Sequence, residues 1–293
     1  MSQHRFLIID GYPPEGRKQF EDVGMGLAGD LYRRMLHRYL PDAEADLWFV
    51  TDPGSTVPTP RDVASYAGIL WPGCSKTVYH NEPSVDAMIQ VTRDAFESGV
   101  PGFGSCWGIQ IAAFVAGGAV EPHPAGREMG IARGITLTAE GTEHPMMAGK
   151  PPVFRHFASH DDHITRLPEG AVCLAGNDWS SIQAATFEHQ DGSFWGVQYH
   201  PEYDLHEMAR LIVARQPKLL KLGFFASHED LNDYVERLEA LHREPDRKDL
   251  RWQLGIGDDV VDRSLREREF ANWVDHFFLK EKVGKQTYSA KNC

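Results

Sequence analysis

The chain has 293 residues and a net charge of −12 at pH 7, from 30 Lys and Arg against 42 Asp and Glu. This acidic balance argues against a nucleic-acid binder and against attachment to an anionic membrane surface, because both need a basic face. No apolar run approaches the ~20 residues of a membrane-spanning helix, and the first residues lack the apolar core of a signal peptide. The four cysteines form no CxxC pair, so we expect reduced thiols in a cytoplasmic protein.

The first hundred residues alternate between strand-like and helix-like segments. Short apolar runs predict strands at 6–10, 45–50, 66–71 and 100–104. Apolar residues at helical spacing predict helices at 27–40 and 84–97. Alternation with short connections implies parallel pairing of the strands and therefore an α/β fold.

The second half of the chain has a different pattern. Short strands are expected at 134–138, 153–158, 171–175, 184–188 and 194–199. The last two flank Gln190-Asp191-Gly192-Ser193, a hairpin signal, so this half should add an antiparallel section. From Tyr203 onward the pattern becomes helical, with helices expected at 227–241 and 262–282. We therefore expect a catalytic domain at 1–205 and a helical extension at 206–293, packed on that domain or on a partner.

The stretch 100–110, VPGFGSCWGIQ, is the most informative part of the sequence. A strand ends at Gly104, a helix begins at Trp107, and Cys106 sits at the turn between them, as a nucleophile does on a strand-turn-helix elbow. The helix N-terminus favours a thiolate there. The alternative for this motif alone is a buried cysteine in a glycine-rich turn.

A second stretch, 195–202, delivers a histidine and a carboxylate. His200 follows a predicted strand and Glu202 is two residues further on, which in an extended segment places both side chains on one side. Glu202 could then hold one imidazole nitrogen while the other faces Cys106, as in a catalytic triad. Taken alone, His-Pro-Glu is equally compatible with a structural turn.

Together these stretches resemble the class I glutamine amidotransferase family. The matching motifs are Gly104-x-Cys106-x-Gly108-x-Gln110 and 196–202, GVQYHPE, with a looser match at 159–162, SHDD, to a segment of the GMP-synthetase type. The resemblance covers about residues 5–205. It implies a flavodoxin-like, doubly wound and mostly parallel sheet, together with a triad of Cys106, His200 and Glu202.

The resemblance also implies roles for the surrounding residues. Cys106 would form a γ-glutamyl thioester, with the backbone amides of Gly73 and Trp107 as the oxyanion hole. Gln110, Ser159 and His160 fall where the family contacts the glutamyl portion of the substrate. Asp161 replaces a family glycine and could either bind the α-ammonium group of the substrate or face solvent.

Two functions remain open from the sequence. The first is a free-standing hydrolase of γ-glutamyl amides, either glutamine or a γ-glutamylated amine or peptide. The second is a glutaminase subunit that delivers ammonia to a separate synthetase. No cofactor is expected. A metal site in the histidine- and aspartate-rich stretch 156–163 is the less favoured interpretation, and the partners considered are a small γ-glutamyl substrate, a synthetase or a second copy of the chain.

Overall fold

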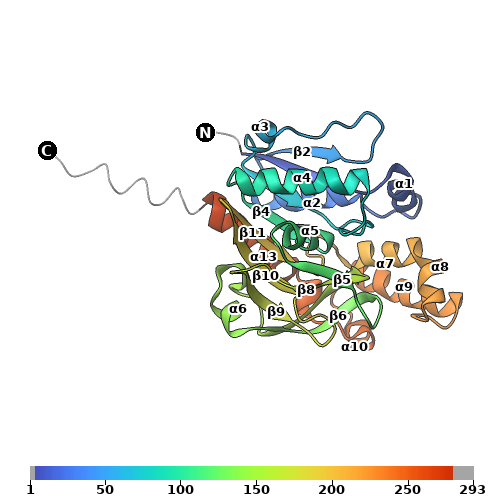
Figure 1. The fold of residues 1–293 in the computed structure, drawn as a ribbon. Coiled ribbons are helices and arrows are strands. Elements are labelled where there is room, and N and C mark those ends of the chain that lie inside the picture. The colour runs from blue at the N-terminus through green and yellow to red at the C-terminus, as the bar shows by residue number, and fades with distance from the viewer. Residues whose placement is uncertain (1–3, 280–293) are drawn as a thin grey trace.

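A mixed sheet of nine strands runs through residues 4–279, the part of the chain that this computed structural model describes (Figure 1). The strands lie in the order β2-β1-β3-β4-β11-β10-β9-β6-β7. Their bounds are Arg5–Asp10 (β1), Glu44–Phe49 (β2), Gly68–Trp71 (β3), Gly102–Ser105 (β4), Glu128–Leu137 (β6), Val153–His160 (β7), Val172–Gly176 (β9), Ala184–His189 (β10) and Gly192–Val197 (β11). Two further strands, Ala119–Pro122 (β5) and Asp162–Arg166 (β8), pair as a separate antiparallel ribbon.

One half of the large sheet is parallel. β1 pairs with β2 and β3, β3 pairs with β4, and β4 pairs with β11, all in parallel. Successive side chains of a strand point to opposite faces, so Phe6 and Ile8 enter one core and Leu7 and Ile9 enter the other. Helices α2 (Ala28–Tyr39) and α13 (Arg268–Val274) cover the first face, and α4 (Pro83–Glu97) and α5 (Trp107–Val115) cover the second. Burial on both faces explains why these strands are continuous apolar runs rather than alternating ones.

The other half of the sheet is antiparallel. β11 pairs with β10 through the expected hairpin, and β10, β9, β6 and β7 continue in antiparallel order. The predicted fold class is therefore confirmed. Two predicted boundaries were wrong: the segment 134–138 is the end of a longer β6 that bulges between Ala132 and Ile135, and β11 ends at Val197 rather than at residue 199.

Helices dominate the chain beyond β11. Helix α9, with its N-cap at Ser227, matches the prediction for 227–241, and Figure 1 shows α7, α8 and α9 grouped at one side of the molecule. Within the described residues, no helix combines the length and apolarity needed to cross a bilayer. The remaining helices are Pro14–Asp22 (α1), Pro60–Val63 (α3), Ala139–Glu143 (α6), Leu205–Ala214 (α7), Gln216–Lys221 (α8), His228–Arg243 (α9), Lys248–Leu254 (α10), Asp258–Val261 (α11) and Arg263–Arg266 (α12), with a 3₁₀ turn at Pro145–Met147 and a π-helical turn at Asp275–Leu279.

The single helix predicted for 262–282 was wrong over the residues that the structure describes. The chain forms α12, then α13, then the π-helical turn, and 280–282 lie outside the described residues. The interruption follows from buried charges. Arg266 donates to the carbonyl of Val260, and Glu267 pairs with Arg38 on α2. Each charge needs a partner on a different element, because a buried charge without one is costly.

Candidate active site

Cys106 lies at the sharp turn between β4 and α5. Its backbone has φ 52° and ψ −108°, and among the described residues other than glycine only Gln190 also has a positive φ. Such a conformation costs of order 1–3 kcal/mol and persists only where neighbouring structure holds it. Here the Cys106 amide donates to the carbonyl of Val197 at 2.8 Å, which ties the turn to the end of β11.

Two glycines let the elbow form. A Cβ on Gly104 would lie 2.9 Å from the backbone of Gly108, and a Cβ on Gly108 would lie 2.3 Å from the carbonyl oxygen of Trp71. Neither contact is possible for a side chain in a packed interior. The glycines of the motif are thus required by the close approach of β3, β4 and α5, and the elbow brings the thiol to the carboxyl edge of the parallel strands.

His200 arrives at the same edge from the end of β11. Its Nδ1 lies 2.7 Å from Oε1 of Glu202, and both side chains are buried. The two residues lie in a turn after the strand rather than in the extended segment that the sequence suggested. The ring of Tyr203 stacks on the imidazole at a centroid distance of 4.2 Å and an interplanar angle of 3°. The imidazole is therefore held by a hydrogen bond at its edge and by ring stacking on its face.

The charge state of His200 is set by its two neighbours. Burial alone would lower the pKa of His200, but the negative charges and hydrogen bonds of Glu202 and Cys106 raise it to about 10. An imidazole with this pKa carries its proton at neutral pH. Because Nδ1 is engaged by Glu202, Nε2 is the ring nitrogen that is left to face the thiol of Cys106.

The loop after β3 closes on the same two side chains. A Cβ on Gly73 would lie 2.7 Å from Cε1 of His200 and 3.5 Å from Cβ of Cys106. Trp107 is the first residue of α5, and the first N–H groups of a helix have no partner within it. The structure thus brings Gly73 and Trp107 to the thiol from two elements, as an oxyanion hole requires.

A cavity of about 200 Å³ lies in front of the thiol. Its wall comes from the parallel sheet edge, from the β6–β8 region and from helices α7 and α8. The lining includes all four residues that the sequence assigned to substrate binding, Gln110, Ser159, His160 and Asp161, together with Tyr12, Cys74, Ser75, Lys76, Thr77, Cys106, Trp107, Arg127, Asp162, His200, Tyr203, Leu211, Arg215 and Lys218.

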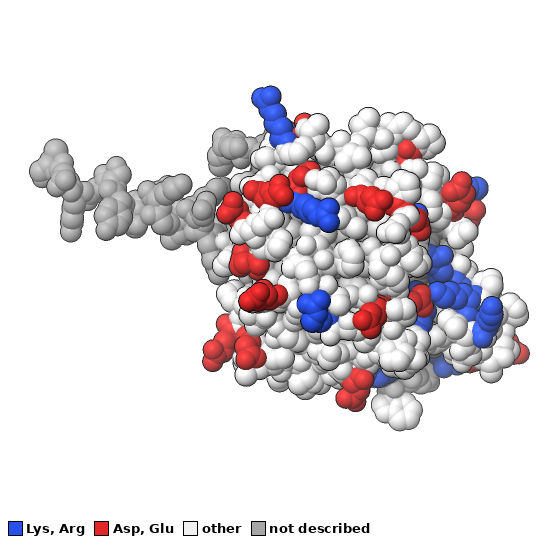
Figure 2. Space-filling model, in the orientation of Figure 1, with Lys and Arg blue, Asp and Glu red and all other residues white. Residues whose placement is uncertain are grey.

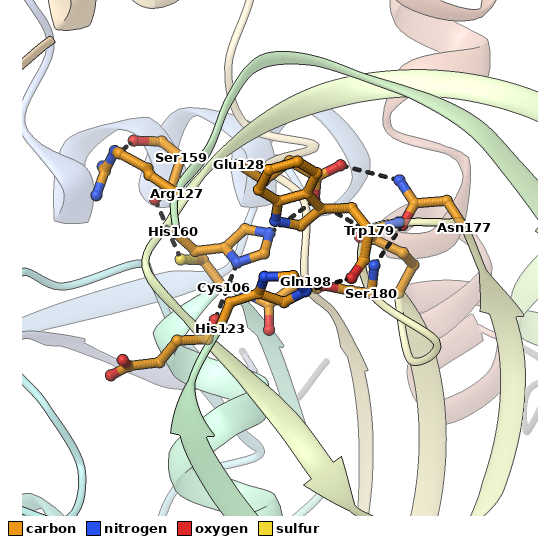
Figure 3. A network of polar contacts seen from close by, with 12 residues as sticks. Cys106, His123, Arg127, Glu128, Ser159, His160, Asn177, Trp179, Ser180 and Gln198 are labelled. Carbon is orange, nitrogen blue, oxygen red and sulfur yellow. Dashed lines mark hydrogen bonds and ion pairs between the residues drawn. The ribbon is translucent and has the colours of Figure 1, made fainter. Parts of the chain in front are cut away.

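Gln110 and His160 are held by other parts of the protein. The side-chain amide of Gln110 donates to the carbonyl of Asp162 at 2.9 Å and to Oε1 of Gln198 at 3.1 Å. His160 uses Nδ1 on the carbonyl of Asp162 and Nε2 on Glu128, each at 2.9 Å. Both ring nitrogens of His160 are therefore occupied within the protein (Figure 3), and His160 acts on the cavity as part of its wall.

Glu128 organises a buried polar network behind His160. It accepts hydrogen bonds from His160 and from the side-chain amide of Asn177, each at 2.9 Å (Figure 3). The side-chain amide of Gln183 donates to it as well, also at 2.9 Å. Burial raises the pKa of Glu128, but these hydrogen bonds and the charge of His160 outweigh it and lower the pKa below its ordinary value. Asn177 and Gln183 come from a loop without a motif, so only the fold reveals them.

Asp161 pairs with two cations at the mouth of the cavity. Its Oδ2 lies 2.6 Å from Arg127 and 2.7 Å from Lys218 of α8, and Arg127 also donates to the Ser159 hydroxyl at 2.6 Å. These ion pairs lower the pKa of Asp161 against the opposing effect of burial. In Figure 2 the largest group of basic side chains on the visible face lies on the right, over the side where Figure 1 places α7–α9, although the chain as a whole is acidic.

The other candidate chemistries have less support among the described residues. No group of three or more His, Cys, Asp or Glu within 4–279 is arranged to hold a metal ion. His156 instead stacks on Tyr199 and hydrogen-bonds to the carbonyl of Arg266. Cys74 is a free thiol in the cavity wall, and burial raises its pKa to about 12, so it stays protonated at neutral pH.

The comparisons with known proteins give a consistent result. The family model "Glutamine amidotransferase class-I" matches residues 28–217. A γ-glutamyl-L-1-hydroxyisopropylamide hydrolase from a Pseudomonas species is 32% identical to the chain, and the match covers 97% of each protein. A glutamine-hydrolysing GMP synthase from Neisseria meningitidis serogroup B is 30% identical over 73% of this chain, which spans only 40% of that enzyme.

Solved structures show the same fold. A glutamine amidotransferase from Thermotoga maritima superposes with a TM-score of 0.62 and 21% sequence identity, over 92% of this chain and 99% of that one. A glutamine amidotransferase from Methylobacillus flagellatus superposes with a TM-score of 0.59 and 20% identity, over 92% of this chain and 96% of that one.

Proposed function

The chain belongs to the class I glutamine amidotransferase family, and on this basis we propose that it hydrolyses γ-glutamyl amide bonds with Cys106 as the nucleophile. One observation carries the proposal: a strained elbow holds the thiol beside an imidazole whose far nitrogen is fixed by a buried carboxylate. The 97% mutual coverage with the Pseudomonas hydrolase favours a free-standing hydrolase over a synthetase domain. We propose a γ-glutamylated small amine as the substrate and a cytoplasmic location.

The proposed reaction begins with attack of Sγ on the γ-carbonyl carbon. The tetrahedral oxyanion is stabilised by the amides of Gly73 and Trp107, and removing one such donor typically costs on the order of 10²–10³ in rate. His200 gives its proton to the leaving nitrogen as the C–N bond breaks, which leaves a γ-glutamyl thioester. The neutral imidazole then takes a proton from water, whose oxygen attacks the thioester carbon. The C–S bond then breaks, which releases glutamate and regenerates the thiolate–imidazolium pair of Cys106 and His200.

The glutamyl portion would occupy the cavity beside Gln110 and His160. Asp161 already holds two cations, so we propose that it shapes the mouth of the cavity together with Arg127 and Lys218. The cationic side chains provide the chemistry for a carboxylate, and the γ-glutamyl group carries one at its α-carbon. In this arrangement the leaving nitrogen lies beside His200, and the rest of the amine extends toward the opening of the cavity.

The GMP synthase relatives favour a second candidate. The chain spans about 40% of those enzymes, which pair a glutamine-hydrolysing activity with a synthetase activity in one name. A glutaminase subunit that depends on a separate synthetase would give little turnover by itself. The hydrolase proposal expects turnover from the isolated chain.

The test is a screen of the purified protein against glutamine and a panel of γ-glutamyl amides, with mass-spectrometric trapping of the thioester. We expect a γ-glutamyl amine to be cleaved faster than glutamine and a γ-glutamyl adduct on Cys106. Cys106→Ala should reduce turnover by at least about 10⁴-fold while leaving the unfolding temperature near that of the wild type. Turnover retained by Cys106→Ala would remove the proposed nucleophile.

A further inference from the structure

Ser105 lies directly before Cys106 and is fully buried at the end of β4. Its hydroxyl donates to Oε1 of Glu202 at 3.1 Å. The same oxygen accepts from Nδ1 of His200 at 2.7 Å. One carboxylate oxygen therefore receives both hydrogen bonds.

The second oxygen of Glu202 does not help to orient the carboxylate, so the two hydrogen bonds to Oε1 must do so. Oε2 is buried, and no residue within 4–279 provides it with a hydrogen bond. A carboxylate fixed through one oxygen by two donors keeps its plane, whereas a single donor leaves it free to turn about that bond. The Ser105 hydroxyl is thus half of what orients Glu202.

The elbow explains why this restraint acts on the reacting atoms. Ser105 and Cys106 are consecutive residues, so their side chains are joined by a backbone that the Val197 hydrogen bond and the adjacent glycines hold in place. Cys106 lies beside His200, and Ser105 donates a hydrogen bond to Glu202. The same turn of chain therefore sets both ends of the pair.

We propose that Ser105 is a positioning residue that acts through Glu202 and extends the Cys106–His200–Glu202 arrangement to four members. This inference rests on the proposed function. In this proposal the end of β4 both presents the nucleophile and orients Glu202. Without the hydroxyl, Glu202 would rotate, and His200 would spend less time aligned for proton transfer to the leaving nitrogen.

The experiment is a double-mutant cycle on the full chain with Ser105→Ala and Glu202→Ala. We expect Ser105→Ala to lower kcat about 10-fold, the scale of one hydrogen bond to a charged group, with KM changed less than about twofold because Ser105 does not line the cavity. In the Glu202→Ala background the same change should cost less than about twofold, since residues that act through one another are not additive.

Ser193→Ala is the matched control. Ser193 lies near the start of β11, at the end away from His200, and its buried hydroxyl has no hydrogen-bond partner among the described residues. Its removal should therefore leave kcat unchanged. Equal losses from Ser105→Ala in both backgrounds, or no loss in the wild type, would overturn the inference. Cys106→Ala separates the two claims: if it is inactive while Ser105→Ala is fully active, only the role of Ser105 fails. If Cys106→Ala is active, the proposed function fails.

Discussion

Two buried histidine–carboxylate pairs lie near the carboxyl edge of the sheet, and they differ in what the second ring nitrogen does. In the His200–Glu202 pair, Nδ1 is fixed at 2.7 Å and Nε2 is left for a thiol. In the His160–Glu128 pair, Nε2 is fixed at 2.9 Å and Nδ1 is bound to a backbone carbonyl. Under the proposed mechanism, His200 can transfer a proton because one of its ring nitrogens has no partner within the described residues, whereas both nitrogens of His160 are occupied.

The carboxylates differ in the same way. Glu128 uses both oxygens on His160, Asn177 and Gln183. Glu202 leaves Oε2 without a partner among the described residues. A fully satisfied buried network stabilises a fold, whereas a partly satisfied one has a cost that a function must justify. We therefore expect changes at Glu202 to affect rate and changes at Glu128 to affect stability.

The largest effect is expected from a change in the His200–Glu202 pair. Glu202→Gln should lower kcat by about 10²–10⁴-fold, because the imidazole loses the acceptor that selects its tautomer, while the unfolding temperature changes little. The Glu202 charge raises the pKa of His200, so its loss should move the alkaline limb of the kcat/KM profile to lower pH. Steady-state kinetics between pH 6 and about 10 measure both effects. An unchanged rate would take Glu202 out of the mechanism.

The second prediction concerns the His160–Glu128 pair, whose hydrogen-bonding groups all have partners. Glu128→Gln replaces an acceptor oxygen with a donor that faces the amides of Asn177 and Gln183. Breaking such a buried network should lower the free energy of unfolding by about 3 kcal/mol. Urea denaturation measures this loss, and kcat for the folded fraction should stay within about 10-fold of the wild type. A Glu128→Gln protein of normal stability but with the rate loss of Glu202→Gln would reverse the comparison.

The third prediction concerns how the stabilisation by Glu128 depends on pH. The pKa of Glu128 is lowered in the folded protein, so its contribution to stability is present above its unfolded pKa and is lost as pH falls through its folded pKa. The difference in unfolding temperature between wild type and Glu128→Gln should therefore shrink as pH falls below about 4.5. Thermal unfolding at several pH values between neutrality and pH 3 measures this. A gap that widens in acid would contradict the role assigned to Glu128.

The smallest expected effect lies at the mouth of the cavity. Lys218 is half exposed and pairs with Asp161 beside His160. Because exposed ion pairs contribute at most about 1 kcal/mol, Lys218→Ala should raise KM by about threefold and leave kcat unchanged. Lys221→Ala, on the same helix but outside the cavity lining, is the control. A fall in kcat with constant KM would place Lys218 in the chemistry instead.

The parallel half of the fold and the elbow were predictable from the sequence. Runs such as 6–10 are apolar on both faces, and the spacing of Gly104, Cys106 and Gly108 has a steric cause that the structure shows directly. The partners of Glu128 could not be predicted, because Asn177 and Gln183 reach it only through the order β9-β6-β7. The predicted helix at 262–282 failed for a related reason, since its apolar stripe gives no sign of where Arg266 and Glu267 find their partners.

Helix α8 has a consequence for how this enzyme could diversify. Arg215 and Lys218 line the cavity although they follow the sheet in the chain. The proposed nucleophile and its imidazole follow strands β4 and β11, whereas this part of the wall lies on the short helix α8. Under the proposed function, substitutions in α8 would change how the mouth of the cavity binds the glutamyl carboxylate while leaving the Cys106–His200 pair intact, so related chains could differ in substrate affinity through a surface helix.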